Sequence, residues 1–278
     1  MAKFNFGNAF AHFANTGAPR GFVWKYALAY VAVQVMFFLL LMMLLGGLAM
    51  GLSSENFQSN PSAMAEALTN SVGGAFLLIL PVSLLIYAVF DAAALRRYIR
   101  RDTFRLRLGG DEWRLFVVLL IWIAAYVGFF MLISVAAIPF VGVSQTVLSL
   151  LGLLAFFAYA YFATRFSPAA ALTIRDRRIR FLGAWETTKG RTGWVLLGVY
   201  AVWLVIAILA YFVTVLVFAS LASVMASSGG TAATVAGIVF LFLFLAAGAA
   251  FFYIWAGPAA LAARADGEDA DLTAEVFS

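Results

Sequence analysis

Six long apolar runs dominate this sequence and restrict its fold more than any other feature. They cover Tyr26–Met50, Gly73–Phe90, Leu115–Ile138, Val143–Thr164, Trp194–Ala226 and Ala233–Ala263. An α-helix rises about 1.5 Å per residue, so about 20 apolar residues cross the hydrocarbon layer of a bilayer. A soluble domain has about 25% charged residues, whereas this chain of 278 residues is 11% charged and 65% hydrophobic. The sequence therefore predicts an all-α, polytopic membrane protein with six transmembrane helices.

The distribution of positive charge predicts how the helices are oriented. All 18 Lys and Arg residues lie in the N-terminal segment, the second and fourth connections between the runs, and the C-terminal tail. The first, third and fifth connections contain none, although residues 51–71 are long enough to hold several. Because basic loops remain on the cytoplasmic side, we expect both termini in the cytoplasm and the protein in a bacterial inner membrane.

Similar residues recur at the ends of the runs and indicate an internal repeat. Each odd-numbered run follows a Gly and a Trp, and each even-numbered run ends in one of three Ala-rich segments, Asp91–Arg97, Ser167–Arg175 and Gly257–Arg264. Since two spans return the chain to its starting side, this pattern predicts three helical hairpins of one orientation. The predicted hairpins cover about 23–109, 110–183 and 184–265, between an interfacial segment 1–22 and an acidic tail 266–278. Convergence on features common at membrane interfaces is the alternative.

The segments outside the spans predict short additional elements. Phe6, Phe10 and Phe13 have helical spacing, which predicts an interfacial helix on the inner leaflet that ends near residues 15–17. Asn60-Pro61 predicts the start of a short amphipathic helix on the outer surface. We expect the acidic tail to be mobile.

The chain offers little that resembles a catalytic or metal site. It has no Cys, and its single histidine, His12, is expected at the membrane interface. Asp111 and Glu112 are adjacent and point in different directions around a helix, unlike a catalytic carboxylate pair. Asp91 and Arg165 are assigned to the cytoplasmic ends of their spans, which leaves no charge at mid-depth and argues against ion-coupled transport. We predict no catalytic, cofactor or metal site, and no enzyme activity.

Two Arg-rich connections remain as candidate binding surfaces. Residues 104–108 and 178–181 alternate apolar and basic side chains, which suits an anionic leaflet if they are extended. Each basic residue near such a leaflet contributes about 1 kcal/mol. The connections lie too close to the spans to form the water-facing platform that nucleic acid requires. The predicted headgroup- or partner-binding residues are Arg100, Arg101, Arg105, Arg107, Arg175, Arg177, Arg178, Arg180, Trp185, Lys189 and Arg191.

The segment Ser167–Trp194 has a recognisable order of features: an Ala- and Pro-rich helix exit, a basic loop, and a Trp-containing lead into the next span. Its matching positions are Pro168, Ala184, Trp185, Thr188, Lys189, Gly190 and Trp194. This segment resembles one in multi-pass bacterial proteins related to the membrane domain of glycerophosphodiester phosphodiesterases. The catalytic barrel of those phosphodiesterases has no counterpart here, so the resemblance implies an inner-membrane protein without phosphodiesterase activity.

Two functions follow from these observations. The first is a non-catalytic membrane protein that binds anionic lipid headgroups, a membrane-protein partner or a second copy of itself through its Arg-rich cytoplasmic loops. The second is a permease or transporter of a lipid-like or small amphiphilic substrate without ion coupling. A cavity lined by Gln34, Ser83 and Gln145 would favour the second function, and a tightly packed bundle would count against it.

Overall fold

The computed structural model describes residues 4–14, 21–52, 61–138, 145–228 and 231–277, and within these ranges the regular structure is entirely helical. The helices are α1 (Phe6–Phe10), α2 (Phe22–Leu52), α4 (Pro61–Arg100), α5 (Gly110–Ala137), α6 (Gln145–Phe166), α7 (Ala169–Asp176), α8 (Gly183–Thr187), α9 (Arg191–Ser228) and α10 (Thr231–Phe277). Six of them, α2, α4, α5, α6, α9 and α10, are long and apolar enough to cross a membrane. The predicted all-α class is confirmed, and the chain is a multi-pass membrane protein.

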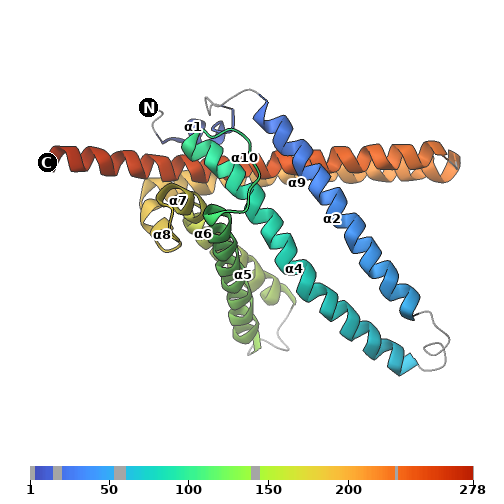
Figure 1. Ribbon diagram of the computed structural model, residues 1–278. Coiled ribbons are helices and arrows are strands. Elements are labelled where there is room, and N and C mark those ends of the chain that lie inside the picture. The colour runs from blue at the N-terminus through green and yellow to red at the C-terminus, as the bar shows by residue number, and fades with distance from the viewer. Residues whose placement is uncertain (1–3, 15–20, 53–60, 139–144, 229–230, 278) are drawn as a thin grey trace.

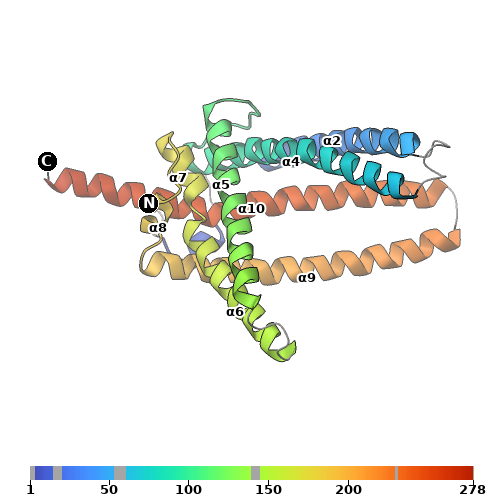
Figure 2. The same cartoon turned by 90° about the horizontal axis from the view of Figure 1, so that it is seen from below.

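Three pairs of long helices spread from a common hub (Figures 1 and 2). Helices α2 and α4 form one pair, α5 and α6 the second, and α9 and α10 the third. Figure 2 shows α5 and α6 leaving the hub in a different direction from the other four. Helix α10 contacts α2, α4, α7 and α9, and the short helices α1, α7 and α8 all contact long helices at the hub.

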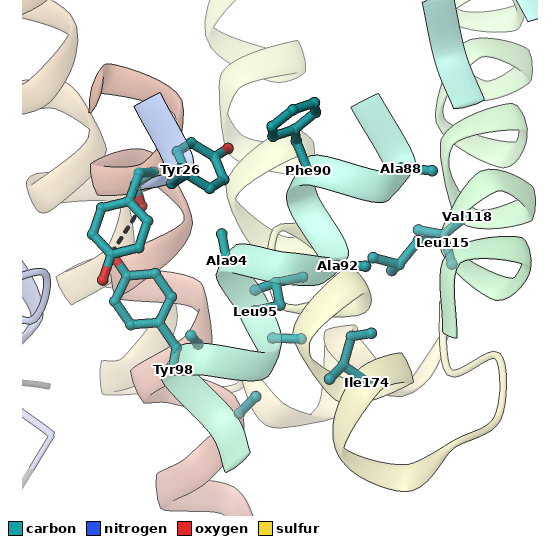
Figure 3. Close-up of a cluster of buried hydrophobic side chains, with 14 of the residues drawn as sticks. Tyr26, Ala88, Phe90, Ala92, Ala94, Leu95, Tyr98, Leu115, Val118 and Ile174 are labelled. Atoms are coloured by element: carbon teal, nitrogen blue, oxygen red, sulfur yellow. Dashed lines mark hydrogen bonds between the residues drawn. The ribbon is translucent and has the colours of Figure 1, made fainter. Parts of the chain in front are cut away.

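Burial is concentrated at the hub and decreases along each long helix. In α4, the Leu80 side chain is 40% exposed whereas Leu95 is 2% exposed. Figure 3 shows Ala88 and Ala92 of α4 facing Leu115 and Val118 of α5. Small side chains let helix backbones approach closely inside a membrane, and the Ala-rich segments supply them at the hub. Their buried members include Ala92, Ala94, Ala169, Ala171, Ala260 and Ala263.

The three Ala-rich segments occupy similar environments but differ in their backbone. Leu95, Leu172 and Leu261 follow the alanines in the three segments, and all three are buried. The first and third segments continue α4 and α10, whereas the second forms the separate helix α7. Pro168 has no N–H to bond the carbonyl of Thr164, and that carbonyl instead accepts the backbone N–H of Ser167 at 3.3 Å and its hydroxyl at 2.8 Å. The shared burial is compatible with a hairpin repeat, which stays a prediction.

The predicted short elements can be compared with the structure one by one. Helix α4 begins at Pro61, as predicted, but it continues to Arg100, so a separate helix on the outer surface is wrong. Helix α1 ends at Phe10 and packs against α9 and α10, while the predicted cap at 15–17 lies outside the described residues. The acidic tail, expected to be mobile, continues α10 as helix to Phe277.

Candidate functional site: an aromatic cavity and a basic surface

A cavity of about 450 Å³ lies at the hub, where the three pairs of helices separate. Residues from all six long helices and from α7 line it. This volume lies within the range of about 300–1,000 Å³ that is typical of small-molecule sites. The structure therefore contains a partly enclosed space among the helices, although Gln34, Ser83 and Gln145 do not line it.

Aromatic side chains form much of the cavity wall. They are Tyr26, Tyr30, Tyr87, Phe90, Trp122, Tyr200, Phe252 and Trp255. The rings hold one another in place: the centroids of Tyr26 and Phe90 lie 5.5 Å apart and those of Tyr200 and Trp255 lie 4.9 Å apart. Figure 3 shows Tyr26 and Phe90 meeting across the interface between α2 and α4. Contacts of this kind give the wall a fixed shape.

Asp91 of α4 is the only charged side chain among the described residues that line the cavity. It lines the cavity together with Tyr26 and Tyr200, and it forms no ion pair or hydrogen bond with the described part of the chain. The nearby arginines are occupied elsewhere. Arg96 pairs with Glu112, and Arg97 lies 4.3 Å from the centroid of the Phe22 ring.

Asp91 lies at the hub end of α4, and its sequence-based assignment to a cytoplasmic helix end stays a prediction. An unpaired carboxylate in an apolar environment is costly, and an ionisable residue inside a membrane domain is a candidate functional residue for that reason. The sequence feature that could have identified Asp91 as a functional residue was its acidic side chain within a span, five positions before Arg96.

The first Arg-rich connection is folded around two carboxylates at the start of α5. Asp111 accepts from Arg100 at 2.8 Å, from Arg107 at 3.3 Å and from Arg114 at 3.2 Å. Glu112 pairs with Arg96 and also accepts the backbone N–H of Gly109 at 2.9 Å. Both carboxylates therefore serve as counter-ions for the arginines that approach the N-terminus of α5.

The second Arg-rich connection is tied to α7 and α10 in a similar way. The Arg175 guanidinium lies 2.7 Å from a carboxylate oxygen of Asp176 and 3.1 Å from one of Asp266. Arg180 approaches Asp176 at 3.0 Å. Trp185 packs against Phe166, with ring centroids 5.6 Å apart. Of the predicted surface residues, Arg100, Arg107, Arg175, Arg180 and Trp185 thus contact other parts of the protein.

The remaining predicted residues form a basic surface. These six residues are exposed and make no ion pair within the described ranges: Arg101, Arg105, Arg177, Arg178, Lys189 and Arg191. Leu108 and Leu182 lie in the same connections and are 65% and 78% exposed. Exposed cations beside exposed apolar groups are typical of a membrane–water interface.

His12 lies inside the protein, and its predicted level at the membrane interface stays a prediction. Its side chain is buried against Tyr98, with ring centroids 5.4 Å apart, and its Nε2 atom has no hydrogen-bond partner. Burial, followed by the positive charge of Arg264, lowers its pKa to about 4. No group of three or more potential metal ligands occurs among the described residues.

Comparisons with known proteins do not extend these findings. No protein-family model, curated protein or solved structure matches the chain. The resemblance of Ser167–Trp194 to the phosphodiesterase membrane domain therefore stays a prediction. The cavity and the basic surface are the two features on which a function can be argued.

Proposed function

We propose that this protein binds a lipid-like amphiphile in the cavity at its hub and acts as a permease or transporter of such molecules. The observation that carries the proposal is the cavity of about 450 Å³ that all six long helices line. A tightly packed helical bundle that serves only as a membrane anchor needs no such cavity. Transporters, in contrast, place their substrate sites between groups of membrane-spanning helices. We assign the protein to a bacterial inner membrane, with both termini and the basic surface on the cytoplasmic side.

The surroundings of the cavity favour an amphiphile over a wholly polar substrate. Its polar groups, including Asp91 and Ser167, lie near the buried hub. Away from the hub the long helices separate (Figure 1), and apolar side chains of α4 such as Leu80 and Val82 are exposed. A ligand with a polar head and an apolar tail fits this arrangement, because its tail would lie between the pairs of helices.

A cavity-filling substitution tests the proposal. Ala163 of α6 lines the cavity, and Ala158 of the same helix is exposed and does not line it. We expect Ala163→Phe to reduce the amount of bound lipid or detergent-like amphiphile by about tenfold or more, as measured by native mass spectrometry of the full chain from nanodiscs. Ala158→Phe adds the same volume and should leave binding unchanged. Equal retention in both variants would show that the cavity is not the binding site.

Anionic headgroup binding at the basic surface is the second candidate function. It is favoured by the exposed, unpaired cations beside Leu108 and Leu182. Since each such cation contributes about 1 kcal/mol, Arg177→Gln with Arg178→Gln should weaken the preference for anionic over zwitterionic lipid about tenfold or more. Glu186→Gln, which removes an exposed negative charge from α8, should not weaken it. An unchanged preference in the double variant would exclude this function.

A further inference from the structure

Asp91 is the feature of the cavity that most restricts its ligand. It has no ion pair among the described residues. Of the two arginines next along α4, Arg96 pairs with Glu112, and Arg97 lies over the Phe22 ring and donates to the Tyr253 hydroxyl at 2.9 Å. Asp91 is half-buried, and a carboxylate in an apolar cavity is stabilised when a counter-charge enters it. Within the described part of the hub no side chain provides that charge, so a ligand can.

The aromatic wall favours the same sign of charge. Tyr26, Tyr200 and Trp255 line the cavity together with Asp91, and the centroids of the Trp255 and Tyr200 rings lie 4.9 Å apart. The face of an aromatic ring carries negative potential and attracts organic cations, more strongly where water is excluded. An anionic headgroup would meet repulsion from both the carboxylate and the ring faces. A neutral headgroup would gain no charge-assisted contact with Asp91.

The cavity therefore differs in sign from the surface around the hub. The basic surface defined by Arg101, Arg105, Arg177, Arg178, Lys189 and Arg191 attracts anions. The cavity holds a single acidic group and no described basic one.

We propose that the cavity selects amphiphiles whose headgroup carries a primary or quaternary ammonium. Asp91 acts as the counter-ion of the ammonium group, and Tyr26, Tyr200 and Trp255 form the aromatic wall around it. The apolar tail lies between the diverging helices. A volume of about 450 Å³ is at the small end of the range for ligand sites, which fits a headgroup better than a pair of acyl chains. This inference rests on the proposed function and adds the charge of the substrate.

The test uses the full chain in nanodiscs and three photoreactive probes that share one alkyl tail. The probes end in trimethylammonium, in a neutral hydroxyl and in a sulfonate. We expect the wild-type protein to bind the ammonium probe at least about tenfold more tightly than the neutral probe, as a charge-assisted contact with a desolvated cation requires. Asp91→Asn keeps the side-chain shape and should reduce this ratio to about one. Glu186→Gln, which removes an exposed carboxylate outside the cavity, should leave the ratio unchanged.

The outcomes separate this inference from the function on which it rests. If the wild-type protein binds the neutral or sulfonate probe as well as the ammonium probe, and Ala163→Phe removes that binding, the charge preference is wrong and the amphiphile site stands. If no probe responds to Ala163→Phe, the proposed function itself fails. The wild-type ratio alone decides the charge preference if Asp91→Asn does not fold. A high ratio that persists in folded Asp91→Asn also overturns the role of Asp91.

Discussion

Replacing Glu112 by Gln removes the counter-charge of a deeply buried arginine. The side chains of Arg96 and Glu112 are only 3% and 1% exposed. When one partner of such a buried pair is removed, the other is left as an uncompensated charge, which typically costs about 3–5 kcal/mol. Glu112 also accepts the N–H of Gly109 at the start of α5, so the substitution further weakens the favourable charge at that helix N-terminus. We therefore expect Glu112→Gln to lower the free energy of unfolding by about 3–5 kcal/mol.

The assay is unfolding of the purified protein in mild detergent, followed by size-exclusion chromatography after heating at a series of temperatures. Asp266→Asn is the matched control, because it breaks the pair with Arg175 at a partly exposed position where ion pairs contribute about 1 kcal/mol or less. The double variant Arg96→Met with Glu112→Gln should recover part of the loss, since it removes the unpaired charge as well. A Glu112→Gln protein as stable as the wild type, or a double variant less stable than Glu112→Gln, would refute this reasoning.

Two further substitutions follow from the packing of the hub. The pKa of His12 is lowered from 6.5 to about 4, so the unfolded chain takes up a proton first as the pH falls. The stability that neutral His12 provides is complete above pH 6.5 and decreases between 6.5 and about 4, by about 3 kcal/mol in total. Unfolding midpoints measured across this range should fall in the wild type and fall less in His12→Phe; equal slopes would contradict the prediction. Gly193→Ala would place a Cβ atom 2.5 Å from the Thr188 carbonyl oxygen and 2.9 Å from the Arg165 guanidinium. We expect it to destabilise the protein by about 1–3 kcal/mol, whereas Gly128→Ala meets nothing within 4 Å and should be neutral or slightly stabilising in the same thermal assay.

The sequence predicted those parts of the fold that depend on local chemistry. Hydropathy locates the six spans because each run must satisfy its backbone within the bilayer as a helix. Asn60-Pro61 correctly predicted where α4 starts, since Pro is favoured in the first helical turn. Its continuation into the second apolar run as one helix was missed, because hydropathy falls before Gly73 although the helix does not end there.

The candidate site depends on contacts between distant segments, so the sequence predicted less of it. Asp91, Tyr200 and Trp255 come from three helices and meet only when the hub assembles. Pairing of Arg175 with Asp266 likewise joins the second Arg-rich connection to α10 across 91 positions. In contrast, Arg100 and Asp111 are only 11 positions apart. From the sequence, Asp111 and Glu112 were considered only as a catalytic carboxylate pair, and their role as counter-ions for the preceding arginines was not predicted.

The divergence of the long helices from one hub makes each pair a lever arm. Helix α9 has 38 residues, which at about 1.5 Å per residue gives a rod of about 57 Å. A rotation of about 5° at the hub would therefore displace its far end by about 5 Å. The cavity lies at the hub, the point about which each pair of helices would rotate. Buried alanines let the helix backbones approach closely there. In this geometry, a small change in the separation of the cavity walls becomes a much larger change in the spacing of the helices across the membrane.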